Sequence, residues 1–338
     1  MLSSEISNSK TTDVGHETIA TMATTTNFEL LAARDDSWAR DDDPSKCRFL
    51  VDGKSIKYVL VEYGVYPKYW VDKMHNDELA VDFPPFPVGA WNVGRISKDP
   101  QTGAPCFSRL ETLALPEAGN AWHPTRIDYF DLATVERCPD ASKRAEKLRR
   151  VAHPSFPGTM LMKIADFPSQ LPWVEREIRA YRALEGTGLT PRFLGHVTES
   201  GRVVGFLLEW LEGADQARPA TLEACHDALK RLHEHGIYHG SAHTENFLCC
   251  SIKAKDGKGE REGEGKVFLI DFEKAKFEVD DVDHKYKVRR QNRDYRSLKS
   301  SMSYLGFLED QTDRCDDAGY ESDTYSDWTP DDADDYIF

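Results

Sequence analysis

The 338-residue sequence lacks the features that mark a disulfide-bonded scaffold, a structural zinc site or a membrane protein. Its seven cysteines are an odd number, and none is spaced as Cys-x-x-Cys, the pattern typical of zinc ligands. No apolar run approaches the roughly 20 residues that span a bilayer. Residues 1–28 hold three acidic residues and no long apolar stretch, unlike a secretory signal. We therefore expect a protein of the reducing cytoplasm, without a membrane span.

Basic residues are scarce at the two ends of the chain, and this scarcity explains the net charge of −15. Residues 1–44 contribute −6 and residues 309–338 contribute −11, so residues 45–308 come out at about +2. Polar and acidic segments of this kind cannot bury enough apolar surface to fold. We predict that both ends are disordered and that the C-terminal acidic segment is a candidate docking site for a protein partner. The middle of the chain remains able to bind an anion.

Residues 45–125 show little regular patterning. One strand-like run at 57–63 is followed by a proline-rich stretch at 83–92. Proline at this density favours extended chain over helix. The pattern predicts an N-terminal extension that packs on the surface of the core, rather than an independent domain.

From residue 126 to residue 308 the pattern predicts a core of alternating strands and helices. The predicted elements are strands at 127–135 and 159–165, a helix at 173–184, a hairpin at 192–209, and helices at 222–235 and 286–308. Pro172 lies in the first turn of the first helix, where proline is well tolerated. Thr221 is the predicted N-cap of the second helix.

Four residues of this core fall in a recognisable order. Lys163 lies in the middle of an apolar strand, and Glu177 lies on the helix that follows. A loop at 239–246 reads His-Gly-Ser-Ala-His-Thr-Glu-Asn, and a later apolar strand delivers Asp271. This order resembles the protein kinases over about residues 126–300. It is most similar to fungal kinase-like proteins and to the aminoglycoside and choline kinase branch, whose loop reads His-Gly-Asp-x-His-x-x-Asn.

The resemblance implies an α+β, two-lobed fold, with an antiparallel sheet in an N-lobe at about 126–209 and a reduced helical C-lobe at about 210–308. It also implies that Lys163, held by Glu177, grips the phosphates of a nucleotide. Asn246 and Asp271 take the positions that hold Mg²⁺, which neutralises charge on the transferred group. ATP and Mg²⁺ are therefore the candidate cofactors.

The sequence also departs from this family. Ser241 stands where the family has its base aspartate, and a hydroxyl does not accept a proton at neutral pH as a carboxylate does. His243 is a candidate substitute, since imidazole has a suitable pKa. Glu273 replaces the glycine of the Asp-Phe-Gly motif. No Gly-x-Gly-x-x-Gly loop precedes Lys163, and the nearest candidate, residues 153–158, would cover phosphates poorly.

Two basic clusters have no place in that scheme. The first lies on or near the last predicted helix, with Asp294 as its single acid: Lys285, Lys287, Arg289, Arg290, Arg293, Arg296 and Lys299. The second surrounds Glu146: Lys143, Arg144, Lys147, Arg149 and Arg150. Such runs are usually solvated faces, and the acidic ends could cover them. Their density also suits the phosphate backbone of a nucleic acid.

Three functions are consistent with these features. The first is a repurposed transferase of fungal secondary metabolism, similar to the arginine-containing cyclodipeptide synthases, which use aminoacyl-tRNA and carry an Asp-Asp-x-x-Glu motif. If that motif occupies the 239–246 loop, only Glu245 is retained. This function makes Glu245 the proton-handling residue, with Ser241, His243 and His239 as the other candidates in the loop.

The second function is a pseudokinase that binds nucleotide without turnover. The third is a small-molecule phosphotransferase, because phosphoryl transfer depends mainly on positioning and charge stabilisation. Only about 40 residues separate Asp271 from the acidic C-terminal segment. This length argues against an enzyme that must hold a protein substrate.

Overall fold

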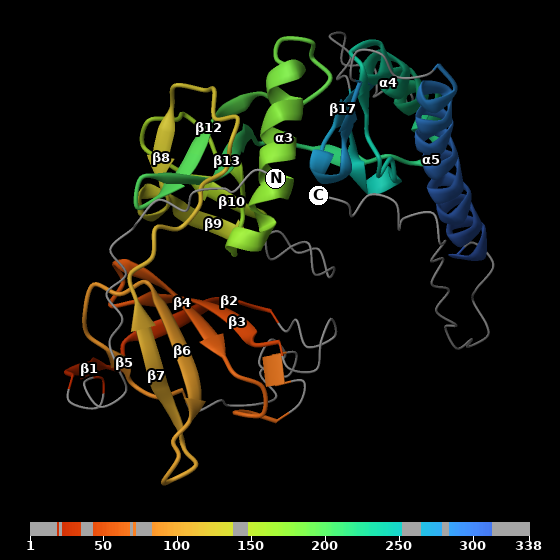
Figure 1. Ribbon diagram of the computed structural model, residues 1–338. Coiled ribbons are helices and arrows are strands. Elements are labelled where there is room, and N and C mark those ends of the chain that lie inside the picture. The colour runs from red at the N-terminus through yellow and green to blue at the C-terminus, as the bar shows by residue number, and fades with distance from the viewer. Residues whose placement is uncertain are drawn as a thin grey trace, which may run out of the picture.

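The computed structural model describes residues 19, 22–34, 43–67, 70–71, 83–137, 148–251, 265–278 and 284–312. These residues form a mixed α+β structure, as the sequence predicted, with three regions that follow one another along the chain (Figure 1). A five-stranded N-terminal sheet is followed by a six-stranded central sheet with one helix and by a C-terminal region with two helices. No helix in the described part of the chain has both the length and the apolarity of a membrane span.

The N-terminal sheet has the strand order β2-β3-β4-β6-β7 and is antiparallel except for the parallel pair of β4 and β6. Its strands are β2 (Phe28–Arg34), β3 (Ser45–Val51), β4 (Ser55–Val61), β6 (Val93–Lys98) and β7 (Pro105–Glu111). The short strands β1 (Thr24–Thr25) and β5 (Phe86–Pro87) pair with each other. An aromatic cluster that includes Phe28, Phe49, Phe86 and Trp91 gives this region a hydrophobic core of its own.

This region is more regular than its sequence predicted. The sequence indicated one strand at 57–63 and extended chain after it, whereas the structure has a complete sheet. The predicted disorder of residues 1–44 is wrong for 28–34, which form β2. Strands β3 and β4 bury residues of both faces, so they lack the alternation of apolar and polar residues that marks a half-buried strand.

The central sheet has the order β8-β12-β13-β11-β10-β9. Its strands are β8 (Arg126–Asp128), β9 (Ala133–Arg137), β10 (Leu148–Ala152), β11 (Met160–Ile164), β12 (Phe193–Glu199) and β13 (Arg202–Glu209). All neighbours are antiparallel except β8 and β12. Helix α3 (Leu171–Ala183) follows β11 through the 3-10 turn η3 (Pro168–Gln170) and packs on this sheet (Figure 1).

The single strand predicted at 127–135 is wrong, because the chain turns within it. The 3-10 turn η1 (Tyr129–Asp131) separates β8 from β9. The turn is fixed locally, since the Asp128 carboxylate accepts a hydrogen bond of 3.0 Å from the Phe130 N–H. An aspartate that bonds the backbone two residues ahead is a common turn device that strand periodicity does not reveal.

The C-terminal region combines two helices with short strands. Its elements are β14 (Ala214–Gln216), η4 (Pro219–Thr221), α4 (Leu222–Glu234), β15 (Ile237–Tyr238), η5 (Thr244–Asn246), β16 (Phe247–Ser251), β17 (Gly265–Leu269), η6 (Phe272–Lys274), β18 (Lys276–Phe277) and α5 (His284–Thr312). Strands β14, β16 and β17 form one small sheet, and β15 pairs with β18. Helix α5 extends beyond the predicted end at 308, and residues 313–338 of the acidic segment lie outside the described residues.

Thr221 occupies the predicted N-cap position of α4, but its side chain does not cap the helix. Its hydroxyl bonds back to Arg218 instead, accepting from the Arg218 N–H at 3.1 Å and donating to the Arg218 carbonyl at 2.9 Å. The preceding turn η4 therefore takes the hydrogen bonds that a cap would supply to the helix.

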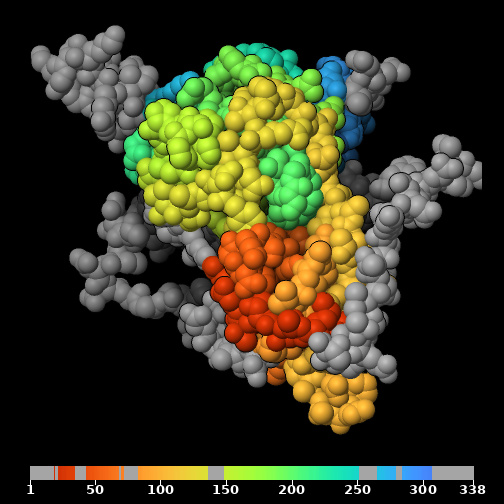
Figure 2. All heavy atoms as spheres, turned by 90° about the vertical axis from the view of Figure 1, so that its left-hand side faces the viewer, coloured from red at the N-terminus to blue at the C-terminus, as the bar shows by residue number. Residues whose placement is uncertain are grey.

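The N-terminal and central sheets are in direct contact. Figure 2 shows the N-terminal sheet (red to orange) pressed against the central sheet (yellow to green). The buried contact includes Tyr58 and Val93 of the N-terminal sheet and Phe167, which follows β11. The N-terminal sheet therefore shares buried surface with the segment that connects β11 to α3.

Gly205 allows the central strands to approach each other, and its substitution gives a test of this packing. It lies on β13 opposite Ile164, where an added Cβ would clash with the Lys163 carbonyl oxygen and lie 2.6 Å from Ile164 Cγ2. We predict that Gly205→Ala lowers the free energy of unfolding by about 1–3 kcal/mol, because overpacking forces strands apart. Urea unfolding measures the change. Gly158→Ala is the control, since nothing lies within 4 Å of its added Cβ; an equal loss in both variants would contradict the prediction.

Candidate functional site

The Lys163 ammonium is surrounded by carboxylates from separate elements. Its Nζ lies 2.5 Å from Glu177 Oε1 on α3 and 2.6 Å from Asp271 Oδ1, two residues after the end of β17. A third carboxylate, that of Glu273, lies 3.8 Å away. The structure thus brings together the lysine, glutamate and aspartate that the sequence placed in order. It adds Glu273, for which the sequence indicated only that it stands in place of a glycine.

Local structure explains why these side chains meet. Met160, Met162 and Ile164 are buried on one face of β11, so the period of two directs Lys163 to the opposite face. Glu177 lies on the buried face of α3. Asp271 has a φ of +64°, a left-handed conformation that is uncommon for a residue other than glycine and is enriched at functional sites.

Two further contacts fix α3 against the segment that carries Asp271. Arg176 donates a hydrogen bond of 2.5 Å to the Glu273 carbonyl oxygen. Five residues further along α3, the Tyr181 ring packs edge-on against Phe272, with ring centroids 5.4 Å apart. The helix and the turn η6 therefore hold the carboxylates on both sides of Lys163.

The electrostatics of this cluster are unbalanced, with three carboxylates around one ammonium group. Burial raises the pKa of Glu177 to about 7, and the charge of Asp271 adds to this effect while Lys163 opposes it. Burial alone would lower the pKa of Lys163, but Glu177 and Asp271 raise it, so the lysine stays charged. Oxygen atoms of Glu177, Asp271 and Glu273 all lie within 4.8 Å of one another, a donor set suited to Mg²⁺ or Mn²⁺.

The buried side chain of Asp294 on α5 supports the start of the 239–246 loop. Its carboxylate accepts backbone hydrogen bonds from His239 at 2.8 Å and from Gly240 at 2.9 Å. The same carboxylate lies 2.9 Å from His233 Nε2 at the end of α4. Asp294 is buried, with 1% of its surface exposed. One side chain therefore fixes the start of the loop to both helices.

In the sequence, Asp294 stands out only as the single acid in a basic run. The sequence did contain a sign of its burial, because Asp294, Leu298 and Met302 recur at a spacing of four, which places them on one helix face. All three are buried in the structure. An acid on an otherwise apolar helix face requires a buried partner. That combination could have marked Asp294 as a support for the loop.

The loop ends beside Asp271. The side-chain amide of Asn246 donates a hydrogen bond of 2.7 Å to the backbone carbonyl of Ser241. The backbone carbonyl of Asn246 accepts one of 3.0 Å from the Ile270 N–H. These bonds orient Asn246 next to the residue that precedes Asp271. His239 is fully buried with its Nε2 3.0 Å from the Ile270 carbonyl oxygen, and burial lowers its pKa. His239 therefore connects the loop to the end of β17.

The remaining candidates of the loop lie differently. Ser241 is buried, with 4% of its surface exposed, whereas His243 and Glu245 are exposed. His243 Nδ1 lies 3.3 Å from the Ser297 hydroxyl on α5. The assignment of a proton-handling role to Glu245, assisted by Ser241, His243 or His239, stays a prediction.

The basic residues of α5 lie mostly on the helix face opposite to Asp294. Five of them are exposed: Lys285, Arg289, Arg293, Arg296 and Lys299. Lys287 forms an ion pair with Glu278, and the Arg290 guanidinium lies 4.2 Å from the centre of the Tyr286 ring. Nucleic-acid binding by this face stays a prediction.

The second basic cluster lies partly outside the described residues, since these omit Lys143, Arg144 and Lys147. Its other two members make internal contacts. Arg149 donates to the Tyr129 hydroxyl at 2.7 Å, and Arg150 bonds Thr159 and Glu212. In the described part of the cluster, the arginines therefore connect strands and loops of the central sheet.

A comparison with family models finds a match between residues 200–329 and the lipopolysaccharide kinase (Kdo/WaaP) family, which is protein-kinase-like. The matched stretch contains the 239–246 loop, Asp271 and Asp294, and it excludes Lys163 and Glu177. A search of curated proteins finds no match to the chain. The match supports a kinase-like fold and a transferase. It favours phosphotransfer over the aminoacyl-tRNA chemistry of the cyclodipeptide synthases, for which it provides no support.

The support that Asp294 gives to the loop can be measured. We predict that Asp294→Ala lowers the free energy of unfolding by about 3 kcal/mol or more, since it leaves buried donors of His239 and Gly240 without their acceptor. Chemical unfolding followed by circular dichroism tests this. Ser300→Ala, on the exposed side of the same helix, should change stability by about 0.5 kcal/mol at most. A similar small effect of Asp294→Ala would show that the loop does not depend on this carboxylate.

The raised pKa of Glu177 predicts a pH dependence of stability. The folded-state pKa of Glu177, about 7, lies above the ordinary value of 4.5, so the folded state is favoured while this carboxyl is protonated. This contribution to the free energy of unfolding is complete at low pH and is lost as the pH rises through about 7. Between pH 5 and pH 8, the free energy of unfolding of the wild type should fall relative to that of Glu177→Gln. The expected fall is on the order of 3 kcal/mol. Exposed Glu223→Gln serves as the control. Parallel pH profiles for wild type and Glu177→Gln would refute the prediction.

Proposed function

We propose that this chain binds ATP with Mg²⁺ and transfers a phosphoryl group to a hydroxyl of a small molecule. The observation that carries this proposal is the placement of Lys163 between Glu177 and Asp271, with Asn246 bonded to Ile270, the residue before the aspartate. The match of residues 200–329 to a kinase family supports the same class of reaction.

The geometry suggests a role for each side chain. Lys163 is the group that would meet the phosphates, and Glu177 holds its ammonium in place. Asp271 and Glu273 offer carboxylate oxygens for Mg²⁺. The backbone of Asn246 is bonded to Ile270, the residue that precedes Asp271. When bound, Mg²⁺ neutralises charge on the transferred group. A cation would also relieve the repulsion between the carboxylates of Asp271, Glu273 and Glu177.

Ser241 determines how the reaction would proceed. The bond between the γ-phosphorus and the bridging oxygen breaks, and a bond to the acceptor oxygen forms, while the acceptor proton passes to solvent. No carboxylate of the 239–246 loop is buried with Ser241, because Glu245 is exposed. Rate enhancement would therefore come from positioning and charge stabilisation, which account for most of the catalysis in phosphoryl transfer.

Nucleotide binding is the first test of this proposal. Mg-ATP should raise the melting temperature of the wild type, and Lys163→Met and Asp271→Asn should abolish the shift, because each removes a charge that meets the phosphates or the cation. Lys230→Met, an exposed lysine on α4, is the matched control and should keep the shift. A wild type that shows no shift at millimolar Mg-ATP would refute nucleotide binding.

Turnover is the second part of the same test. ADP formation should be measurable with a panel of sugars and amino alcohols as acceptors, and the assay should include two variants of the loop. Ser241→Asp should raise the rate by up to roughly 10²–10⁴-fold, since it supplies a carboxylate base, whereas Ser241→Ala should leave it nearly unchanged. Binding of Mg-ATP without ADP formation by the wild type or by Ser241→Asp would instead identify a pseudokinase.

A further inference from the structure

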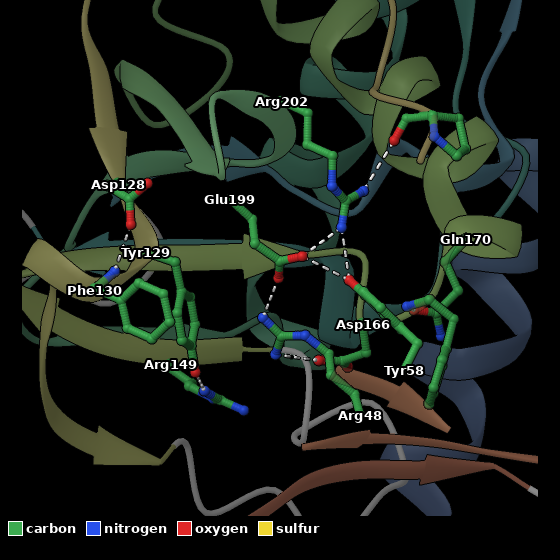
Figure 3. A network of polar contacts seen from close by, with 12 residues as sticks. Arg48, Tyr58, Asp128, Tyr129, Phe130, Arg149, Asp166, Gln170, Glu199 and Arg202 are labelled. Atoms are coloured by element: carbon green, nitrogen blue, oxygen red, sulfur yellow. Dashed lines mark hydrogen bonds and ion pairs between the residues drawn. The ribbon is translucent and has the colours of Figure 1, made fainter. Parts of the chain in front are cut away.

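Arg48 connects the N-terminal sheet to the central sheet through a buried polar network. It lies on β3 with its side chain fully buried. Its Nη2 donates a hydrogen bond of 2.7 Å to Glu199 at the end of β12, and its Nη1 lies 3.6 Å from Asp166 (Figure 3). The guanidinium also lies over the Tyr129 ring, 4.8 Å from its centre. Arg48 therefore contacts three separate segments of the central region.

A second arginine shares only part of this network. Arg202 donates to the same Glu199 carboxylate and, at 2.7 Å, to the Tyr58 hydroxyl (Figure 3). It also donates to the Pro116 carbonyl at 2.9 Å. Although burial opposes ionisation, Arg48 and Arg202 together lower the pKa of Glu199, so the carboxylate remains charged. Of the two arginines, Arg48 is the one paired with Asp166.

Asp166 lies in the segment that connects β11 to α3. It comes three residues after Lys163 and precedes the turn η3 that leads into α3, the helix that carries Glu177. The next residue, Phe167, packs against Tyr58 and Val93 of the N-terminal sheet. The N-terminal sheet therefore holds two adjacent residues of the connection between β11 and α3, one by charge and one by apolar packing.

We propose that Arg48 is a positioning residue for the candidate nucleotide site. By holding Asp166, it sets the path from β11 to α3 and thereby the approach of Glu177 to Lys163. Arg48 itself touches neither residue of that pair. The effect on nucleotide affinity rests on the proposed function, whereas the effect on α3 does not.

A general loss of stability is the alternative explanation for any effect of Arg48. Removing one partner of a buried ion pair leaves an uncompensated charge and destabilises a protein by about 3–5 kcal/mol wherever the pair lies. Arg202 provides the matched comparison. It shares Glu199 with Arg48 and lies in the same interface, but it does not pair with Asp166.

The first experiment compares Arg48→Met, Asp166→Asn and Arg202→Met in the full chain, measuring melting temperature and the Mg-ATP dissociation constant. Arg48→Met and Asp166→Asn should weaken nucleotide affinity by roughly 3-fold to 30-fold, the range expected for coupling through packed elements. Arg202→Met should lower the melting temperature but change affinity less than about twofold. The double variant Arg48→Met/Asp166→Asn should have an Mg-ATP dissociation constant no higher than the higher of the two single-variant values, since both substitutions remove the same contact. Equal affinity losses in all three variants would overturn the proposal.

The second experiment is independent of nucleotide and uses amide hydrogen exchange. Arg48→Met and Asp166→Asn should exchange faster over α3, with α4 as the internal reference, while Arg202→Met should leave the ratio of the two helices unchanged. If the wild type binds no Mg-ATP, the proposed function fails and this ratio still decides the role of Arg48. If Arg48→Met does not fold, Asp166→Asn decides it. A uniform increase of exchange over both helices would show that Arg48 contributes stability alone.

Discussion

The structure depends on keeping one ammonium group, that of Lys163, among carboxylates that come from distant parts of the chain. Glu177 arrives on α3, and Asp271 and Glu273 arrive after β17. A cluster with more acids than bases repels itself, so these elements must be held together by contacts outside the cluster. The contacts of Arg176 with Glu273 and of Tyr181 with Phe272 provide such support. The excess of negative charge is also the property that makes the cluster suitable for a divalent cation.

A second constraint acts on the opposite side of the site. The loop of residues 239–246 has an irregular backbone, and buried N–H groups of such a loop need acceptors. Asp294 supplies them from the buried face of α5, and the Asn246 amide closes the other end of the loop onto the Ser241 carbonyl. The long, basic helix α5 is therefore connected to the loop through one acidic residue, Asp294.

The sequence predicted the elements with strong periodicity and missed those whose partners are remote. Helices α3 and α4 match their predicted ranges closely, because each has an apolar face at helical spacing. The meeting of Lys163, Glu177 and Asp271 was predictable from their order and from the resemblance to kinases. Arg48 was not, since it lies 151 residues from Glu199 in a strand buried on both faces, where an arginine suggests a surface position.

In the proposed phosphotransfer, Ser241 stands where the kinases that this sequence resembles have their base, and this gives the supporting contacts more weight. A carboxylate base contributes roughly 10²–10⁴-fold to the rate of an enzyme that has one, in addition to what positioning supplies. In the proposed phosphotransfer, no carboxylate is buried beside Ser241, so most of the rate enhancement would come from the placement of Lys163 and the carboxylates around it. That placement is set by the path of the chain from β11 to α3, which the N-terminal sheet contacts at Asp166 and Phe167. The N-terminal sheet is thus a structural part of the candidate site, although none of its residues reaches Lys163 in the described contacts.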